Sequence, residues 1–413
     1  MKIFLKILAL FLISLLGIIY LAFLIVPYFI NLDKFKSEIQ KPVLENSKLN
    51  LDYSKLKLYS TPLLSFGVVL EDVKVSMPDN STLFRADKIK TGIALPSLLT
   101  LTIKTALSEI ENPQVNLDIV SYSDRETQYK IAKLVEEIIN ENLKKPKQEP
   151  KQMPLWVETL ITKIKIKVPS VKLTNLDVEI NELKTKNNLS LKSNELVLGY
   201  NSAKNTAKIK SDIKLLSNKK ENIIANIDVI SVLPKFEKSK DETDPDEEIK
   251  LPFINIVEIY QKYDLNAQLN SKLRIKNSKD DALLIFGFLN VDDLNLKLSN
   301  LRLPNSFLHA DFKGEQVNYE SSINVVNKES LNLSGYLKHG KHSKMKTTIV
   351  CDKIHFTNLV DLLKGLLDSL SIKNNLAQIK TTGYLSANAT FKTNFKKIKS
   401  EGSVLIKDGS FIN

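Results

Sequence analysis

Apolar and polar residues alternate along most of this chain. In the stretch LNLKLSNLRL, residues 294–303, a leucine stands at every second position on either side of Ser299 and Asn300. A side-chain period of two is typical of a β-strand, whose successive residues point to opposite faces. The leucines change from even to odd positions at Ser299-Asn300, which indicates either a β-bulge or a tight turn, and we favour the bulge. The pattern predicts a strand with one apolar and one polar face.

Similar alternation recurs throughout the sequence and predicts a mainly β protein. The clearest further segments are LNLDY, VNLDI, IKIKV, LDVEI, DLNAQLNSKLRI and LNLSGYL, at residues 49–53, 115–119, 164–168, 176–180, 264–275 and 331–337.

Apolar residues spaced by three and four predict a few amphipathic helices. A short one is expected over residues 31–43, with its cap at Asn31 or Asp33. The remaining candidates are QYKIAKLVEEIINENLKK, PLWVETLIT, LPFINIVEIYQKY and TNLVDLLKGLLDSL, at residues 128–145, 154–162, 251–263 and 357–370. The fold class we expect is therefore mainly β with a few amphipathic helices, in the α+β class.

The N-terminus carries one long apolar run. No residue from Ile7 to Leu32 is charged, which gives 26 positions, or about 39 Å of helix, enough to span a bilayer. Lys2 and Lys6 precede the run, so the positive-inside rule places the N-terminus in the cytoplasm and the bulk of the chain across the membrane. The run is too long for the apolar region of a typical signal peptide and no A-x-A-like site follows it. We therefore expect an uncleaved transmembrane helix.

Two segments predict breaks in the fold, because they combine proline or charge with few apolar residues. They are KKPKQEPKQMP, residues 144–154, and EKSKDETDPDEEIK, residues 237–250. The second lacks the spacing of a calcium-binding loop, so we expect it to be a solvated loop. The organisation we expect is a transmembrane anchor over 1–30, a β region with helices over 31–143, a linker over 144–154 and an elongated β region over 155–413.

The chain is basic, but its charge does not indicate a nucleic-acid-binding protein. It has 59 Lys+Arg against 47 Asp+Glu, a net charge of +12, and only four of the basic residues are arginines. Specific nucleic-acid readers use clustered arginines, whereas the lysines here alternate with apolar residues, as in KIKIKV. We expect a solvated lysine face, which discourages aggregation through sheet edges, and no nucleic-acid partner.

Residue types that form common catalytic and metal sites are scarce. The chain has one cysteine, Cys351, and four histidines, of which His339 and His342 stand in a Gly- and Lys-rich stretch that predicts an exposed loop. No Gly-rich phosphate loop, HExxH, GxSxG or CxxC motif occurs. We expect Cys351 to be a small buried residue. We also expect no enzymatic activity, no cofactor and no metal site.

Both ends of the chain carry a recognisable order of elements and motifs. Near the N-terminus, residues 31–99 carry a short helix, a strand pair around Pro62 and Gly67, and the strands LEDVKV and FRADKI leading to LPSLL, followed by IENPQVNLDI. Near the C-terminus, a Leu-rich helix precedes two strands and a G-x-V-x-I-x-D-G element from Gly402 to Gly409. These two regions, about a third of the chain, resemble the AsmA family. The chain departs from the family in lacking a glycine after the first helix and in stopping at Asn413, where family members continue.

The resemblance implies an inner-membrane-anchored periplasmic protein with an elongated, curved antiparallel β-sheet groove, related to bridge-like proteins that carry phospholipid toward the outer membrane. The residues alone allow either a closed β-sandwich or an open apolar groove, and a membrane tether favours a lipid ligand in the groove. We name eight leucines as candidate lipid-binding residues: Leu265, Leu269, Leu273, Leu294, Leu296, Leu298, Leu301 and Leu303.

The implied partners are phospholipid, the inner membrane, and outer-membrane or other envelope proteins. The alternative function is a membrane-tethered scaffold that helps outer-membrane assembly without carrying lipid.

Overall fold

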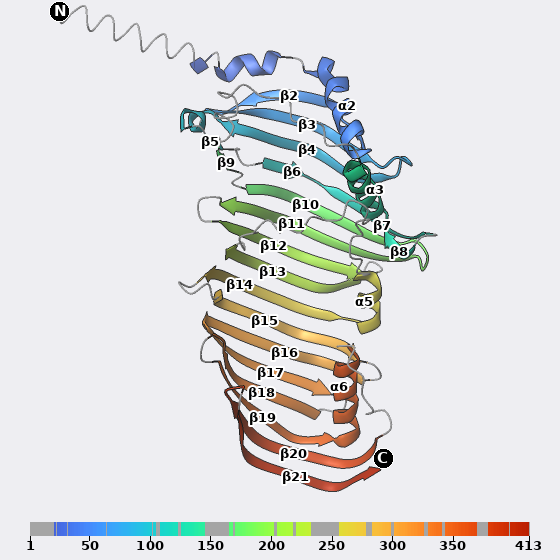
Figure 1. The fold of residues 1–413 in the computed structure, drawn as a ribbon, viewed down its shortest axis with the longest axis vertical. Helices are drawn as coiled ribbons and strands as arrows, with labels where there is room; N and C mark the ends of the chain where they lie inside the picture. The colour runs from blue at the N-terminus through green and yellow to red at the C-terminus, as the bar shows by residue number, and fades with distance from the viewer. Residues whose placement is uncertain are drawn as a thin grey trace, which may run out of the picture. The chain divides into compact units, whose positions relative to one another are not determined.

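The computed structural model describes residues 20–21, 23–30, 32–62, 64–100, 102–104, 108–122, 125–144, 165–167, 170–201, 205–217, 220–232, 256–277, 283–298, 301–325, 329–340, 343–369, 379–395 and 397–412. Of the described residues, 69% lie in strands and 20% in helices, so the predicted mainly β fold with a few helices is confirmed. Figure 1 draws the helices and strands of the chain, which divides into two compact units. Unit 1 comprises residues 1–186, 193–206 and 235–253, and unit 2 comprises residues 187–192, 207–234 and 254–413.

Unit 1 contains most of the helical turns and the shorter strands. Its helices are η1 (Val26–Phe29), η2 (Asp33–Phe35), α2 (Lys36–Ser47), η3 (Leu95–Thr100) and α3 (Lys130–Lys144). Its strands are β1 (Asn50–Asp52), β2 (Lys55–Ser60), β3 (Ser65–Ser76), β4 (Thr82–Ala94), β5 (Thr102–Lys104), β6 (Ser108–Glu111), β7 (Gln114–Tyr122), β8 (Arg125–Tyr129), β9 (Lys165–Lys167) and β10 (Ser170–Glu182), and the two units share β11 (Asn187–Asn201).

The main sheet of unit 1 is built around β3. Strands β1 and β2 both pair antiparallel with β3, β3 pairs with β4, and β4 pairs with β6 and β7. β10 then joins β6 and β7 in parallel, and β5 and β9 form a separate parallel pair, so the predicted purely antiparallel sheet is wrong at these positions. β10 follows the predicted linker in sequence but pairs with strands that precede it.

Helix α2 covers part of the apolar face of this sheet. Tyr53, Leu56 and Val73 form a buried cluster, and Ile39 of α2 packs against it. Our capping prediction for this helix is wrong. The residue before α2 is Phe35, which makes no capping bond, and the Asp33 carboxylate instead accepts the backbone N–H of Leu56 at 2.9 Å.

Unit 2 is dominated by long strands. They are β12 (Thr206–Ser217), β13 (Lys220–Val232), β14 (Asn266–Asn277), β15 (Leu283–Leu298), β16 (Leu301–Gly314), β17 (Gln316–Val325), β18 (Glu329–Lys338), β19 (Lys344–His355), β20 (Lys380–Thr393) and β21 (Ile398–Ile412). Two helices accompany them, α5 (Ile256–Tyr263) and α6 (Phe356–Ser369).

From β14 to β21 each strand pairs antiparallel with the next one in the chain, and β13 pairs with β14 in parallel. At the slip in the leucine pattern, Leu298 of β15 pairs with Leu301 of β16 and Leu296 pairs with Leu303. The chain therefore reverses direction between Leu298 and Leu301. The expected bulge within one strand is therefore wrong, whereas Ser299 and Asn300, where the alternative places a tight turn, lie outside the described residues.

Several predictions can be compared with the described residues. Helices predicted over 31–43, 128–145 and 357–370 are confirmed as α2, α3 and α6, and the segment over 251–263 contains α5. Cys351 is buried as predicted. The helix over 154–162, the segment over 237–250 and all but the first residue of the segment over 144–154 lie outside the described residues, as do residues 1–19 of the N-terminus. No helix among the described residues is long and apolar enough to span a membrane.

Candidate functional site

The sheet of unit 2 presents one continuous apolar face. Residues paired directly across neighbouring strands point to the same face, so the register defines rows of side chains that cross the sheet. The central row of the apolar face runs from β14 to β20 through Leu269, Val291, Leu308, Ser321, Leu333, Ile349 and Ala389. The next row contains Leu289, Ala310, Tyr319 and Phe391, and the one beyond it contains Leu273, Phe312, Val317, Leu337 and Met345.

The opposite face is polar. Its central row is Asn270, Asn290, His309, Glu320, Ser334, Thr348, Thr390 and Glu401. Even on the apolar face, hydroxyl groups are matched to each other. The hydroxyls of Tyr319 and Thr347 hydrogen bond to each other across Gly335, where an added Cβ would lie only 1.9 Å from the backbone oxygen of Lys346. The two faces thus differ sharply in chemistry.

Two irregularities keep the apolar face continuous along β15 and β16. The register shifts between Val291 and Leu294, and again between Leu294 and Leu296. Asp293 and Asn305 adopt left-handed backbone conformations at these points, with φ of 49° and 47°. Asp and Asn tolerate this conformation better than other non-glycine residues. Because an extra residue is accommodated at each shift, Leu294 and Leu296 stay on the same face as Val291.

One end of the apolar face is covered by helix α6. Seven buried residues form a cluster here, which we call the covered cluster: Leu298, Leu301, Leu303, Val325, Cys351, Ile354 and Leu362. Leu359 of α6 and Tyr263 of α5 pack against it. Helix and sheet approach closely, since a Cβ added to Gly365 of α6 would lie 2.8 Å from the Cβ of Leu298. This end is an ordinary hydrophobic core.

The rest of the apolar face is open. In the part of the chain that the structure describes, α6 packs on β15, β16, β19 and β20 around the covered cluster, and no second sheet lies over the central rows. Most of their side chains are half-buried by neighbours on the same strand layer, and Leu308 keeps 37% of its surface exposed. We call these three rows the open face.

The eight predicted leucines are divided between these environments. Leu269 and Leu273 lie on the open face. The lipid-binding assignment is not supported for Leu298, Leu301 and Leu303, because their side chains are already buried in the covered cluster, and Leu296 packs against it. Leu294 lies between the two regions, half-buried on the same face.

Leu265 serves a local structural role between α5 and β14. Its carbonyl oxygen accepts a hydrogen bond from the Tyr260 hydroxyl at 2.6 Å. Burial, with a smaller contribution from the Asp264 carboxylate, raises the pKa of Tyr260 to about 12. This contact holds the end of the helix against the start of the strand.

The eight predicted leucines do not include the residues of the open face on its middle strands. The open face also includes Leu308, Leu333, Ile349 and Phe391. Leu333 stands in the alternating segment LNLSGYL, so its orientation was available from the sequence. That Leu333 shares a face with Leu308 and Ile349 can be known only from the order in which the strands pair.

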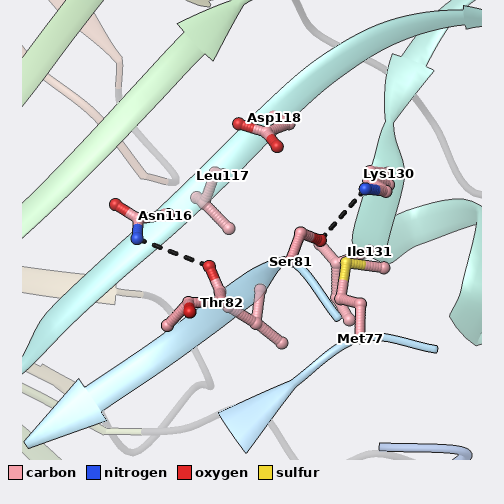
Figure 2. Close-up of a pocket in the computed structure, with 9 residues that line it drawn as sticks. Met77, Ser81, Thr82, Asn116, Leu117, Asp118, Lys130 and Ile131 are labelled. Carbon is pink, nitrogen blue, oxygen red and sulfur yellow. Dashed lines mark hydrogen bonds between the residues drawn. The ribbon is translucent and has the colours of Figure 1, made fainter. Parts of the chain in front are cut away.

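Unit 1 contains a small pocket (Figure 2). It holds about 10 Å³, at the lower limit for one water molecule. Lys130, at the start of α3, donates a hydrogen bond to the Ser81 hydroxyl at 3.0 Å and forms an ion pair with Asp79. The Lys130 ammonium and hydrogen bonds from Ser81 hold the pKa of Asp79 well below its usual range. These contacts of Lys130 hold α3 against the β3–β4 hairpin. The pocket itself is too small for a ligand.

Among the described residues, no group of three or more His, Cys, Asp and Glu side chains is placed to bind a metal ion. No protein-family model matches this sequence, and a comparison with curated proteins finds no match. The open face of unit 2 is therefore the candidate site that the geometry itself supplies.

Proposed function

We propose that the open face binds the acyl chains of phospholipid and that the protein is a membrane-anchored lipid-binding or lipid-transfer protein. The observation that carries this proposal is the row from Leu269 to Ile349, which crosses six strands, is aliphatic at every strand except at Ser321, and has no covering layer in the described part of the chain. Contiguous apolar surface of this kind usually marks a binding site.

The energetics favour an apolar ligand over water on this face. Moving an acyl chain from a bilayer into water costs about 0.8 kcal/mol per CH₂, so a 16-carbon chain faces a barrier of about 12 kcal/mol. A continuous apolar track lowers that barrier without an energy source. The polar opposite face and the uncharged surface of the open rows fit a ligand whose tails lie on the sheet while its headgroup stays in water.

The sequence supports the cellular setting of the proposal. The uncharged run from Ile7 to Leu32 fits a membrane anchor, and the resemblance to the AsmA family fits an inner-membrane protein whose sheet lies in the periplasm and contributes to outer-membrane biogenesis. In that setting the elongated, curved groove expected from the resemblance would shield phospholipid in transit.

Mass spectrometry of the organic extract of the purified full chain tests the proposal. Phospholipid should co-purify with the wild type, and Leu333→Asp, which places a carboxylate on the open face, should reduce its amount several-fold while the protein stays folded. Asn332→Asp is the matched control, since Asn332 is the preceding residue and points to the polar face. Equal lipid content in all three proteins would contradict the proposal.

A second candidate, a membrane-tethered scaffold without lipid, is favoured by β21. In the described part of the chain β21 pairs only with β20, and Val404, Leu405 and Ile406 keep 61%, 65% and 51% of their surface exposed. A strand that has one unpaired edge and exposed apolar side chains is suited to binding a partner strand from an envelope protein. Absence of lipid in the extract, together with a cross-link from Leu405 to a partner, would favour this function.

A further inference from the structure

One end of the unit 2 sheet gathers lysines on its polar face. The hairpin tips between β18 and β19 and between β20 and β21 form this end, and α6 lies at the other end of the strands (Figure 1). The register places Lys338 opposite Lys344, and it places Lys346, Lys392 and Lys399 in one row across three neighbouring strands. Like charges directly opposite each other destabilise a sheet. A negatively charged partner bound there would relieve this repulsion.

The chain itself supplies little negative charge at this end. Lys338 lies 3.6 Å from Glu315, and Glu401 stands one row further along β21. Within the described ranges, no ion pair is formed by Lys344, Lys346, Lys392 or Lys399. The sheet of unit 1 is different, because its lysines face acidic partners on neighbouring strands. The shortest of these pairs are Lys57–Glu71 at 2.6 Å and Lys88–Glu111 at 2.7 Å.

Two large apolar side chains lie at the same end of the sheet as these lysines. Phe395, in the β20–β21 turn, keeps 60% of its surface exposed, and Ile398, at the start of β21, keeps 76%. The turn is held by its own side chains. The Thr393 hydroxyl accepts the backbone N–H of Phe395, and the side-chain Oδ1 of Asn394 accepts the backbone N–H of Lys397, both at 2.9 Å. The aromatic ring is thus presented to solvent by a hydrogen-bonded turn.

We propose that this basic end docks on the surface of a bilayer that contains anionic phospholipid. Lysines within reach of a negatively charged leaflet each strengthen binding, and they bury their aliphatic stems near the headgroups. Exposed aromatic and aliphatic residues beside them enter the interfacial layer, where such side chains are favoured. The lysines lie on the opposite face of the sheet from the open face, whereas Ile398 extends the outermost row of the open face beyond Met345 and Thr393.

Docking at this end would bring the row of the open face nearest the hairpin tips to the membrane surface. The row of the open face nearest the tips contains Leu337 and Met345, and Met345 pairs with Thr393 beside the β20–β21 turn. Acyl chains could then pass between the bilayer and the sheet at the tips. This entry route rests on the proposed function, whereas the docking itself does not.

A flotation experiment tests the docking. The full chain, reconstituted into phosphatidylcholine nanodiscs, is mixed with vesicles of phosphatidylcholine alone or of phosphatidylcholine with phosphatidylglycerol, and the nanodiscs that float with the vesicles are measured. The wild type should float with the anionic vesicles only, and less as salt is raised. Lys392→Glu/Lys399→Glu should weaken binding about five-fold or more for each lysine replaced, and Phe395→Ser should weaken it at unchanged charge.

The matched control is Lys297→Glu, an exposed lysine on the same polar face at the α6 end of the strands. It should float as the wild type does. Equal flotation with neutral and anionic vesicles, or an equal loss in Lys297→Glu, would overturn the proposal, as would binding to soluble heparin without binding to either vesicle. Leu333→Asp keeps the docking and the proposed function apart, because it should lower the co-purified phospholipid while flotation with anionic vesicles stays unchanged.

Discussion

The covered cluster and the open face belong to one apolar surface of the same sheet, yet they have different partners. At the covered end, α6 fills the space over Leu298 and Leu301, and those side chains are almost fully buried. Over the central rows, Leu308 and Leu333 have only neighbours in their own layer among the residues that the structure describes. The alternating pattern in the sequence is the same in both regions. An apolar strand face therefore predicts burial, but the covering element decides whether that burial serves stability or binding.

The largest difference between the regions is expected from a buried charge. Leu298→Asp places an unpaired carboxylate beneath α6 and should destabilise unit 2 by about 4 kcal/mol or more. Leu333→Asp, in the half-buried open face, should cost about 1 kcal/mol, because water can reach the carboxylate. Urea unfolding followed by circular dichroism measures both. Equal losses of stability would show that the open face is covered in solution.

Truncation should give a smaller contrast of the same sign. Leu362→Ala removes a fully buried side chain of α6 and should cost about 2–5 kcal/mol. Leu308→Ala removes a side chain that is already 37% exposed and should cost about 1 kcal/mol or less. Thermal unfolding of the two variants checks the ratio. A larger loss for Leu308→Ala would place an unidentified layer over the open face.

Gly365→Ala tests how tightly α6 is seated. Alanine favours a helix by about 1 kcal/mol over glycine, but its Cβ would lie 2.8 Å from the Leu298 Cβ, and such crowding costs about 1–3 kcal/mol. We expect a net loss of about 1 kcal/mol in the free energy of unfolding. In a Leu298→Gly background, which removes the opposing Cβ, Gly365→Ala should lose most of this penalty, and a stabilised single variant would contradict the close contact.

The smallest effect concerns the thiol of the covered cluster. Burial, followed by the nearby Asp352 and Glu329 carboxylates, raises the pKa of Cys351. Since the neutral thiol is favoured in the fold, its contribution to stability is complete below the unfolded pKa of about 8.5 and is lost as the pH rises through the folded value. Alkylation should therefore be slow at pH 8 in the native state and fast in urea. Because Cys351 is the only cysteine, the readout is a single thiol.

Much of the fold follows from residue periodicity, because strand alternation and helical spacing are local signals. The faces of β14, β15 and β18 and the existence of α2, α3 and α6 were predicted in this way. The position of α6 over Leu298 was not predictable, since it depends on a contact between residues about 60 positions apart in sequence. The same reason applies to the parallel pairing of β10 with β6 and β7.

The candidate site was predicted in part for a related reason. Ser299-Asn300 was interpreted as a bulge, whereas the register shifts lie at Asp293 and Asn305, where the leucine pattern shows them less clearly. Leu269 and Leu273 were assigned to the correct face because their strand alternates without interruption. Leu298, Leu301 and Leu303 carry the same signal, and only the helix over them changes their role.

The order of strands in unit 2 also bears on how such a protein can vary. From β14 to β21 every strand is bonded to its neighbours in the chain, so a hairpin inserted or deleted between them leaves the remaining pairs unchanged. Each added hairpin would lengthen the apolar track by about 10 Å, two strand spacings, while preserving its chemistry. Evolution could thus adjust the distance that the sheet covers in whole hairpins, without redesigning a core.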